Sequence, residues 1–196
     1  MAVGQGKSGR EFQELENDLL SRVGRGDRAA FQALYQRFQR PLFGFLMRMV
    51  RDQAMSDELL NDVMLEVWRT ASAFEGRSAA GTWIFGIAHN KAISLLRRRR
   101  EEQMPEDAAD TLIDDAATPD QTAEQADMSR VMRKMIDRLT PEHRAVLQLT
   151  YYQDMSVQEI AEALDCPVNT VKTRMFYGRA RLKEMLADAG IQGVVQ

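Results

Sequence analysis

The chain has 196 residues, of which 44% are hydrophobic and 28% charged, and its sparse glycine and proline favour an all-α globular fold. A single cysteine, Cys166, excludes an internal disulfide and favours a reducing compartment, so we expect a cytoplasmic protein. No apolar run approaches the roughly 20 residues that cross a bilayer, and two histidines with one cysteine make no zinc-ligand set, so we expect neither a membrane span nor a metal or other cofactor.

The net charge of −3 is unevenly distributed along the chain. Ten Asp or Glu and no Lys or Arg lie between Glu101 and Asp127, and the remainder has 26 basic against 19 acidic residues, a balance of +7. The acidic segment is poor in large apolar residues, which is typical of a linker. We therefore expect a tail over 1–10, a helical domain over 11–100, a linker over 101–127, a second helical domain over 128–188 and a tail over 189–196.

The first domain is predicted to contain four helices, starting with apolar residues at helical spacing after the N-terminal tail. Asp27 and Ser56 are placed to cap the second and third helices. Pro41 is expected to kink or restart the second helix. A loop of small residues over 73–81 precedes the fourth helix, which is expected from about 82 to 100.

The second domain is also predicted to contain four helices, the first over 128–139. The run Thr-Pro-Glu at 140–142 is a helix start, with a cap, a proline at the first turn and an acid at the positive helix end. Residues 156–159 fit a capping box. The last helix, over about 168–186, follows a turn at 165–167.

Residues 156–177 are typical of a helix-turn-helix. Ala161 provides the small contact between the two helices, and Leu164, Val168 and Val171 are apolar anchors for the second helix. Hydroxyls and Lys suit base edges and Arg suits phosphates, whereas the alternative is a solvated basic helix of an ordinary bundle. The outer face comprises Asn169, Thr170, Lys172, Thr173, Phe176 and Tyr177, flanked by Arg174, Arg179, Arg181 and Lys183.

Residues 74–100 form a second candidate surface. Aromatic side chains beside a small-residue loop, followed by polar and basic residues, suit single-stranded nucleic acid, whose bases stack while cations follow the backbone. We expect Trp83 in the core, leave Phe74 open between core and pocket, and interpret the arginine run at 97–100 by default as a charged helix end. The nucleic-acid candidates are Phe74, Phe85, His89, Asn90, Lys91, Ser94 and Arg97.

The predicted third helix has an acidic face that includes Asp57, Glu58, Asp62 and Glu66. Such a face is usually only solvated, but within a basic domain it is also suited to dock a basic partner helix. The sequence lacks the usual components of a catalytic site, because there is no phosphate-binding glycine loop and the carboxylates cluster in the linker. We therefore expect no enzyme.

These motifs, in this order, resemble the σ70 superfamily, specifically the extracytoplasmic function (ECF) σ factors. The matching stretches are ELLNDVMLEVWR, FEGRSAAGTWIFGIAHNKAISLLRRRR and the region from Leu139 to Leu186, nearly all of the chain outside the tail and linker. The resemblance implies two small helical domains, a σ2-like and a σ4-like helix-turn-helix domain, joined by a flexible acidic linker. It implies binding to core RNA polymerase through the β′ clamp helices and β flap, and promoter-specific initiation in a stress or envelope response under an anti-σ factor.

The resemblance also implies roles for individual residues. The polymerase-docking helix would use Asp57, Glu58, Asn61, Asp62 and Glu66. Phe74 and Asn90 would form the pocket for a flipped −10 base, with His89, Lys91, Ser94 and Arg97 along the same strand or its upstream duplex. The −35 bases would meet Lys172, Thr173, Phe176 and Tyr177, and nearby phosphates would meet Asn169, Thr170, Arg174 and Arg179. The linker would thread near the RNA exit path of the polymerase.

The chain departs from the family pattern at several positions. Gly86 stands where a basic residue is common, and Asp165 replaces a common turn glycine but tolerates left-handed backbone. Asn61 replaces a usual Gln, Gly81 a large residue and Tyr177 a basic one. The alternative functions are a duplex-binding helix-turn-helix regulator, a σ mimic that titrates an anti-σ factor, and a nucleic-acid enzyme.

Overall fold

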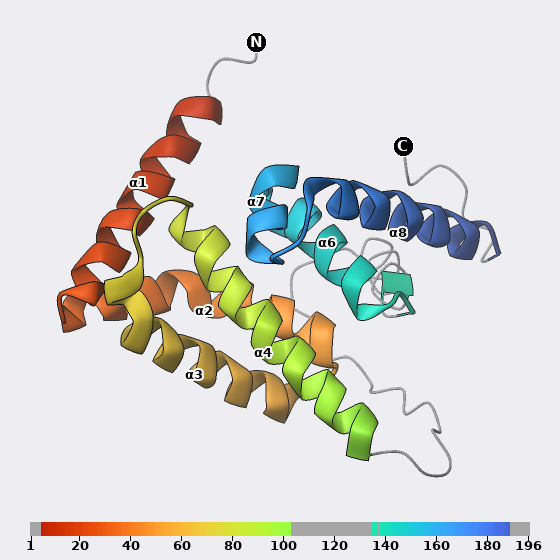
Figure 1. Cartoon of the computed structure of the whole chain (residues 1–196), viewed down its shortest axis with the longest axis horizontal. Helices are drawn as coiled ribbons and strands as arrows, with labels where there is room; N and C mark the ends of the chain where they lie inside the picture. The colour runs from red at the N-terminus through yellow and green to blue at the C-terminus, as the bar shows by residue number, and fades with distance from the viewer. Residues whose placement is uncertain (1–4, 103–134, 137, 189–196) are drawn as a thin grey trace, which may run out of the picture.

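The computed structural model describes residues 5–102, 135–136 and 138–188. Over these residues the chain forms seven α-helices and one short 3₁₀ helix without any strand, which confirms the all-α expectation (Figure 1). None of the helices in this part of the chain is long and apolar enough to cross a membrane. The elements are α1 (Gln5–Gly24), α2 (Arg28–Val50), α3 (Gln53–Thr70), η1 (Ala71–Ala73), α4 (Ala80–Glu102), α6 (Pro141–Tyr152), α7 (Val157–Ala163) and α8 (Val168–Asp188).

Three sequence expectations fall wholly or mainly outside the described residues: the acidic linker, most of the helix expected over 128–139, and the C-terminal tail. The N-terminal tail was expected to run to residue 10, but α1 already begins at Gln5, so the expected boundary is wrong. Helix α2 continues through Pro41 without the restart that was considered possible there.

Helix caps determine where α2 and α3 begin. The Asp27 side chain accepts a hydrogen bond from the Ala30 backbone N–H at 3.0 Å, as predicted. That N–H and then the Arg22 guanidinium, 2.8 Å away, hold the pKa of Asp27 below its ordinary value. The predicted Ser56 cap is wrong, since Asp52 caps α3 one turn earlier, through the Met55 N–H at 2.9 Å. Ser56 is instead buried, and its hydroxyl donates to the Asp52 carbonyl at 2.7 Å.

The predicted starts of α6 and α7 are both confirmed. The Thr140 hydroxyl accepts from the His143 N–H at 3.4 Å, and Pro141 takes the first helical position. At α7 the capping box is reciprocal. Ser156 accepts from the Glu159 N–H at 3.2 Å, and the Glu159 carboxylate accepts from the Ser156 N–H at 2.8 Å.

The two helix groups, α1–α4 and α6–α8, pack directly on each other. One hydrophobic core runs from α1 through α4 into α6, α7 and α8, and α4 lies against α7 while α2 lies against α6 (Figure 1). A smaller second cluster unites Leu139, Leu147 and Leu182 with their neighbours in the C-terminal group. The helix pattern of the sequence predicted both groups, but carried no information on how they meet.

An aromatic cluster lies at the centre of the N-terminal group. Phe85 is 2% exposed, and its ring stands edge-on to Phe45 at 5.5 Å and to Phe38 at 6.4 Å between centroids. The prediction that Phe85 contacts DNA is therefore wrong, because its ring is enclosed by α2 and α4. Trp83, expected in the core, is partly buried against it.

Replacing Phe85 with alanine should lower the free energy of unfolding by about 3–5 kcal/mol, because a buried ring is lost and a cavity remains. Phe176→Ala is the matched control: the same atoms are deleted from a side chain that is 68% exposed, so a change of about 0.5 kcal/mol or less is expected. Urea unfolding followed by circular dichroism measures both. Equal losses in the two variants would contradict the placement of Phe85.

Candidate nucleic-acid and polymerase interfaces

Helices α7 and α8 form the predicted helix-turn-helix. The turn closes through the Leu164 N–H to the Ile160 carbonyl at 2.9 Å and the Cys166 N–H to the Ala161 carbonyl at 3.0 Å. Asp165 has φ 46°, the left-handed conformation anticipated for this position. Ala161 and Val171 are buried between the helices. These contacts fix the orientation of α8 against α7, and the opposite face of α8 is exposed.

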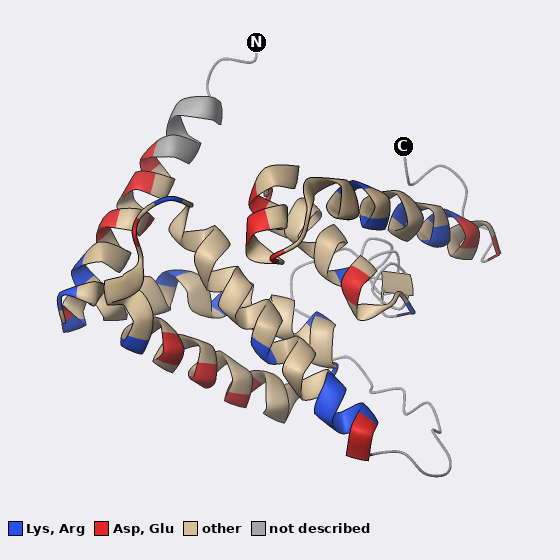
Figure 2. Cartoon of the chain, viewed as in Figure 1, with Lys and Arg blue, Asp and Glu red and all other residues tan. Residues whose placement is uncertain are grey.

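The free face of α8 is basic and aromatic, and Figure 2 shows Lys and Arg repeating along this helix. Phe176 and Tyr177 are 68% and 57% exposed and lie edge to face, with ring centroids 5.4 Å apart. Arg179 is half-buried, with its guanidinium 5.7 Å from the centre of the Tyr151 ring. A shallow groove beside these residues is lined by Val157, Met175 and Ala180, among others. Asn169, Lys172 and Thr173 are exposed on the same helix, and Thr170 and Arg174 are half-buried.

The second candidate surface lies on the loop before α4 and on α4 itself. Phe74 is half-buried, with its ring 5.6 Å from that of Trp83, so it packs on the core and still presents part of its surface. The loop is held by Asn17 of α1, whose side-chain oxygen accepts from the Ala80 N–H at 2.7 Å. This positioning role of Asn17 was not predicted, because it joins residues far apart in the sequence.

The polar candidates on α4 begin about two helical turns beyond Trp83. Asn90 and Arg97 are exposed, and Ser94 is half-buried. Lys91 is also half-buried, with its ammonium 3.9 Å from a carboxylate oxygen of Glu66 on α3. These side chains are available to a ligand approaching the exposed side of α4.

His89 is not available in this arrangement. It is 9% exposed, and charges from the C-terminal group act on it, Arg174 of α8 and Glu142 of α6. Burial lowers the pKa of His89 and Arg174 adds to that effect, whereas a hydrogen bond with Asn90 and the charge of Glu142 oppose it. The expected contact of His89 with DNA is contradicted here, because the helices of the C-terminal group cover it.

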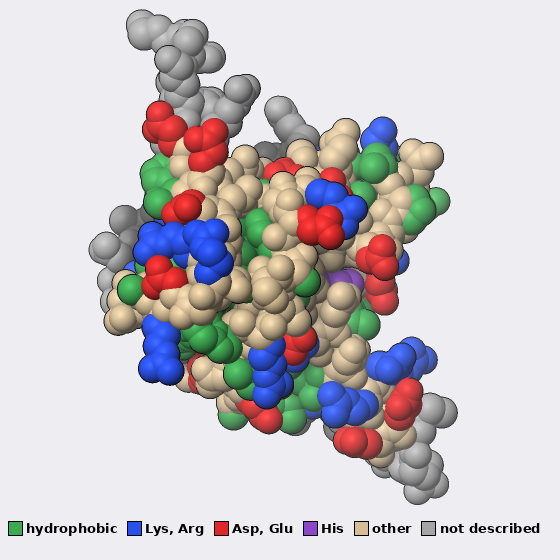
Figure 3. Space-filling model, turned by 60° about the vertical axis from the view of Figure 1, so that its left-hand side comes forward, with side chains coloured by type: hydrophobic (Ala, Val, Ile, Leu, Met, Phe, Trp, Pro, Cys, Tyr) green, Lys and Arg blue, Asp and Glu red, His purple; other side chains and the backbone are tan. Residues whose placement is uncertain are grey.

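The acidic face of α3 is exposed as a unit. Asp57, Glu58, Asn61 and Asp62 recur at helical spacing and are all exposed, and Figure 2 shows the acids following one side of the helix. Glu66 is half-buried beside Lys91. Leu65 is 46% exposed and adds an apolar side chain beside these acids. It was not singled out from the sequence, because only the polar residues of this face were considered there. Over the face turned forward in Figure 3, basic and acidic side chains are interspersed.

Two protein-family models match the chain: Sigma-70 region 2 over residues 34–102 and Sigma-70, region 4 over residues 129–182. The RNA polymerase sigma-H factor of Pseudomonas aeruginosa is 30% identical over 183 residues, 89% of this chain and 95% of the relative. The ECF RNA polymerase sigma-E factor of Haemophilus influenzae is also 30% identical, over 89% of this chain and 96% of that protein. The chain belongs to the σ70 family of RNA polymerase sigma factors, in its ECF group.

Two solved structures have the same fold. CnrH, solved in complex with the cytosolic domain of CnrY, gives a TM-score of 0.66 at 23% identity over 89% of this chain and 98% of the other. The sigma factor RpoE in complex with the anti-sigma factor NepR from Bartonella quintana gives a TM-score of 0.65 at 22% identity, over 80% of this chain and 98% of the other. The region 2 match falls on α2–α4, and the region 4 match includes all of α6 and α7. As a sigma factor, the chain directs core polymerase to promoters.

The left-handed residue in the turn gives a test of the helix-turn-helix. Asp165→Val should lower the free energy of unfolding by about 1–2 kcal/mol, because a β-branched residue is strained at this φ, while Asp165→Gly should change it less. Urea unfolding of the two variants measures the difference. If both unfold at the same urea concentration, the left-handed turn does not constrain the sequence at this position.

Proposed function

We propose that this sigma factor acts by binding alone, without catalysing a reaction, and that it does so in the bacterial cytoplasm where polymerase meets promoter DNA. The α6–α8 group would anchor on −35 duplex and the α1–α4 group would hold a melted −10 base. The −35 assignment rests on the exposed basic and aromatic face of α8 within the helix-turn-helix. Lys172 and Thr173 would meet base edges, and Phe176 and Tyr177 would meet apolar base surface.

The −10 role is proposed for Phe74 and Asn90, with Lys91, Ser94 and Arg97 along the strand. The half-exposed ring of Phe74 against Trp83 supports it, because a base can stack only on an aromatic side chain that the core leaves partly open. Extruding a base costs a few kcal/mol, which pocket contacts and polymerase docking would offset.

Polymerase docking is proposed for the acidic face of α3, against the β′ clamp helices, with the β flap as a second contact. Regulation by an anti-σ factor in a stress or envelope response is proposed as well, since the sigma factor RpoE, which has the same fold, was solved in complex with the anti-sigma factor NepR. A mimic that only titrates an anti-σ factor would have no use for the exposed recognition helix.

Run-off transcription with core polymerase on a −35-dependent promoter tests the −35 assignment. Lys172→Ala should reduce promoter affinity by about 1–3 kcal/mol, roughly five- to 150-fold, with core binding intact, because one base contact is lost. Arg40→Ala is the control, because it removes an exposed positive charge from α2 away from α8. Loss of core binding in the Lys172 variant would contradict the division of roles.

Charge reversal tests the docking face. Asp62→Lys should weaken binding to core polymerase by about tenfold or more, since an attractive contact with a basic helix becomes repulsive. Glu14→Lys makes the same change at an exposed position of α1 and should leave core affinity unchanged. Titration of fluorescently labelled core measures both, and equal affinities would exclude α3 as the docking surface.

A further inference from the structure

Arg179 of α8 is held by an aromatic ring rather than by hydrogen bonds. Its guanidinium carbon lies 5.7 Å from the centre of the Tyr151 ring, which belongs to the last turn of α6. The Nε atom is buried, and no acceptor in the described part of the chain takes its hydrogen. Nor does a carboxylate of the described residues pair with it. Such an arginine still has its full donor capacity for a ligand, because the ring satisfies the cation without using its N–H groups.

The close packing of α8 on α6 brings the two side chains together. A Cβ atom at Gly178 would stand 3.1 Å from the Cδ1 atom of Leu147, so a glycine here allows the two helices to approach. Tyr151 follows Leu147 by four positions and therefore shares its face of α6. Arg179 follows Gly178 directly, and its side chain meets the Tyr151 ring at the edge of this contact. Tyr151 is 52% exposed, so its main contact there is with the arginine and not with the core.

Arg179 belongs to a row of positive charges along one side of α8. The groove beside this helix is lined by Lys172, Met175, Phe176, Arg179 and Lys183, among others. The three basic residues are separated by seven and four positions, which places them on the same side of a helix. Lys172 and Lys183 are exposed. The row therefore presents its charges in one direction.

The spacing along α8 indicates which part of a DNA duplex each cation would meet. Seven residues of helix rise about 10.5 Å, so Arg179 stands about that far along α8 from Lys172. The major groove is about 12 Å wide. If Lys172 reads a base edge inside the groove, Arg179 reaches its rim, where the phosphates lie. A guanidinium suits a phosphate there, because its planar fork donates two parallel hydrogen bonds.

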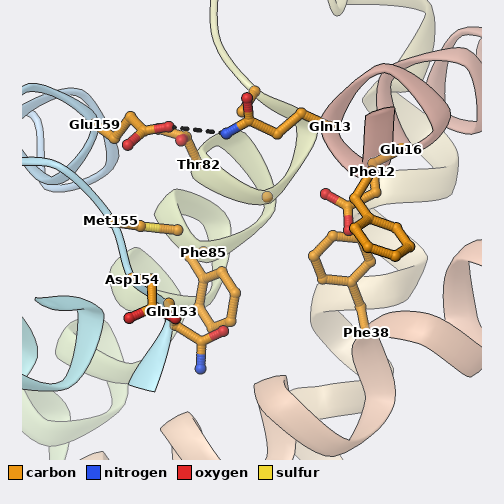
Figure 4. A pocket seen from close by; sticks show the side chains of 12 residues that line it. Phe12, Gln13, Glu16, Phe38, Thr82, Phe85, Gln153, Asp154, Met155 and Glu159 are labelled. Carbon is orange, nitrogen blue, oxygen red and sulfur yellow. Dashed lines mark hydrogen bonds between the residues drawn. The ribbon is translucent and has the colours of Figure 1, made fainter. Parts of the chain in front are cut away.

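A cleft at another place in the molecule has the opposite chemistry. Figure 4 shows this cleft, whose lining includes Glu16, Asp154 and Glu159. Gln13 donates its amide hydrogen to the Glu159 carboxylate at 3.3 Å. The carboxylates would repel a phosphate, whereas the described lining of the groove beside α8 has three cations and no carboxylate. Of these two hollows, only the groove beside α8 suits the DNA backbone.

We infer that Tyr151 is a positioning residue, whose ring fixes the Arg179 guanidinium against one phosphate of the −35 duplex at the rim of the major groove. The inference rests on the proposed function, because it requires that α8 enters the −35 major groove. A phosphate contact carries no sequence information of its own. Tyr151 and Arg179 therefore set affinity and register, whereas Lys172 discriminates between bases.

The first test uses holoenzyme assembled from core polymerase and the full chain, titrated onto a −35-dependent promoter fragment. Tyr151→Leu should weaken binding about two- to fivefold, and Tyr151→Phe, which keeps the ring, should bind like the wild type. Tyr152→Leu is the matched control, because its ring carries Arg48 of α2 and not Arg179. Urea unfolding should be unchanged in Tyr151→Leu, since the side chain is 52% exposed. Equal binding by Tyr151→Leu and the wild type, or an equal loss in Tyr152→Leu, overturns the inference.

A double-mutant cycle separates positioning from general packing. Arg179→Ala should reduce the slope of log affinity against log salt by about 0.9, the value for one phosphate contact. In that background Tyr151→Leu should cause no further loss, because the ring acts only through the arginine. Arg181→Ala removes the same charge from the opposite side of α8, where Arg181 pairs with Glu184 at 3.0 Å, and should change the slope less. Fully additive losses for Tyr151→Leu and Arg179→Ala overturn the positioning role.

Single neutral methylphosphonates along the −35 duplex then identify the phosphate. Wild-type holoenzyme should lose affinity at one or two adjacent positions, and this loss should vanish in Arg179→Ala and shrink in Tyr151→Leu. If the wild type does not distinguish the promoter from one with a scrambled −35 element, the proposed −35 role fails and the inference fails with it. If it does distinguish them, but all variants give the same methylphosphonate profile, the inference alone is overturned.

Discussion

Helix α4 is packed from two sides, and the rest of the structure depends on this. Ile84, Phe85 and Ala88 turn into the core shared with α2 and α3, while Gly86 meets α7 and His89 lies under the C-terminal helices. Because side chains three and four positions apart share a helix face, the face that holds α7 continues into Asn90. The helix proposed to contact −10 DNA is therefore also the helix on which the group proposed to bind −35 DNA packs.

Local structure could be predicted well from the sequence. Caps at Asp27, Thr140 and Ser156 were correct because each depends only on a polar side chain and a backbone N–H within the next few residues. The left-handed conformation at Asp165 was anticipated differently, from the glycine common at this position in the family and from the tolerance of Asp for this backbone region. The prediction of a Ser56 cap failed because Asp52 is an equally good cap one turn earlier. Only the burial of Ser56, which the sequence does not show, decides between the two residues.

The errors concern residues whose role depends on distant partners. Phe85 and His89 lie in a segment with the composition of a nucleic-acid surface, but helices far away in sequence bury both. Gly86 was recognised as unusual for its position, yet its meaning required Ala163. Arg144 was not singled out at all, since a charged residue within an amphipathic helix is normally solvated; it is buried here because backbone carbonyls of two helix groups satisfy it.

The acids of α3 are exposed while the two helix groups are packed together. Asp57, Glu58 and Asp62 would therefore be accessible to polymerase without any rearrangement of the packing between α4 and α7. A partner that binds two states equally shifts neither, however tightly it binds. Docking on α3 alone would accordingly leave that packing unchanged. Surfaces buried between the groups, such as His89 and the guanidinium of Arg144, could be reached only by a partner whose own contacts favour a separated arrangement.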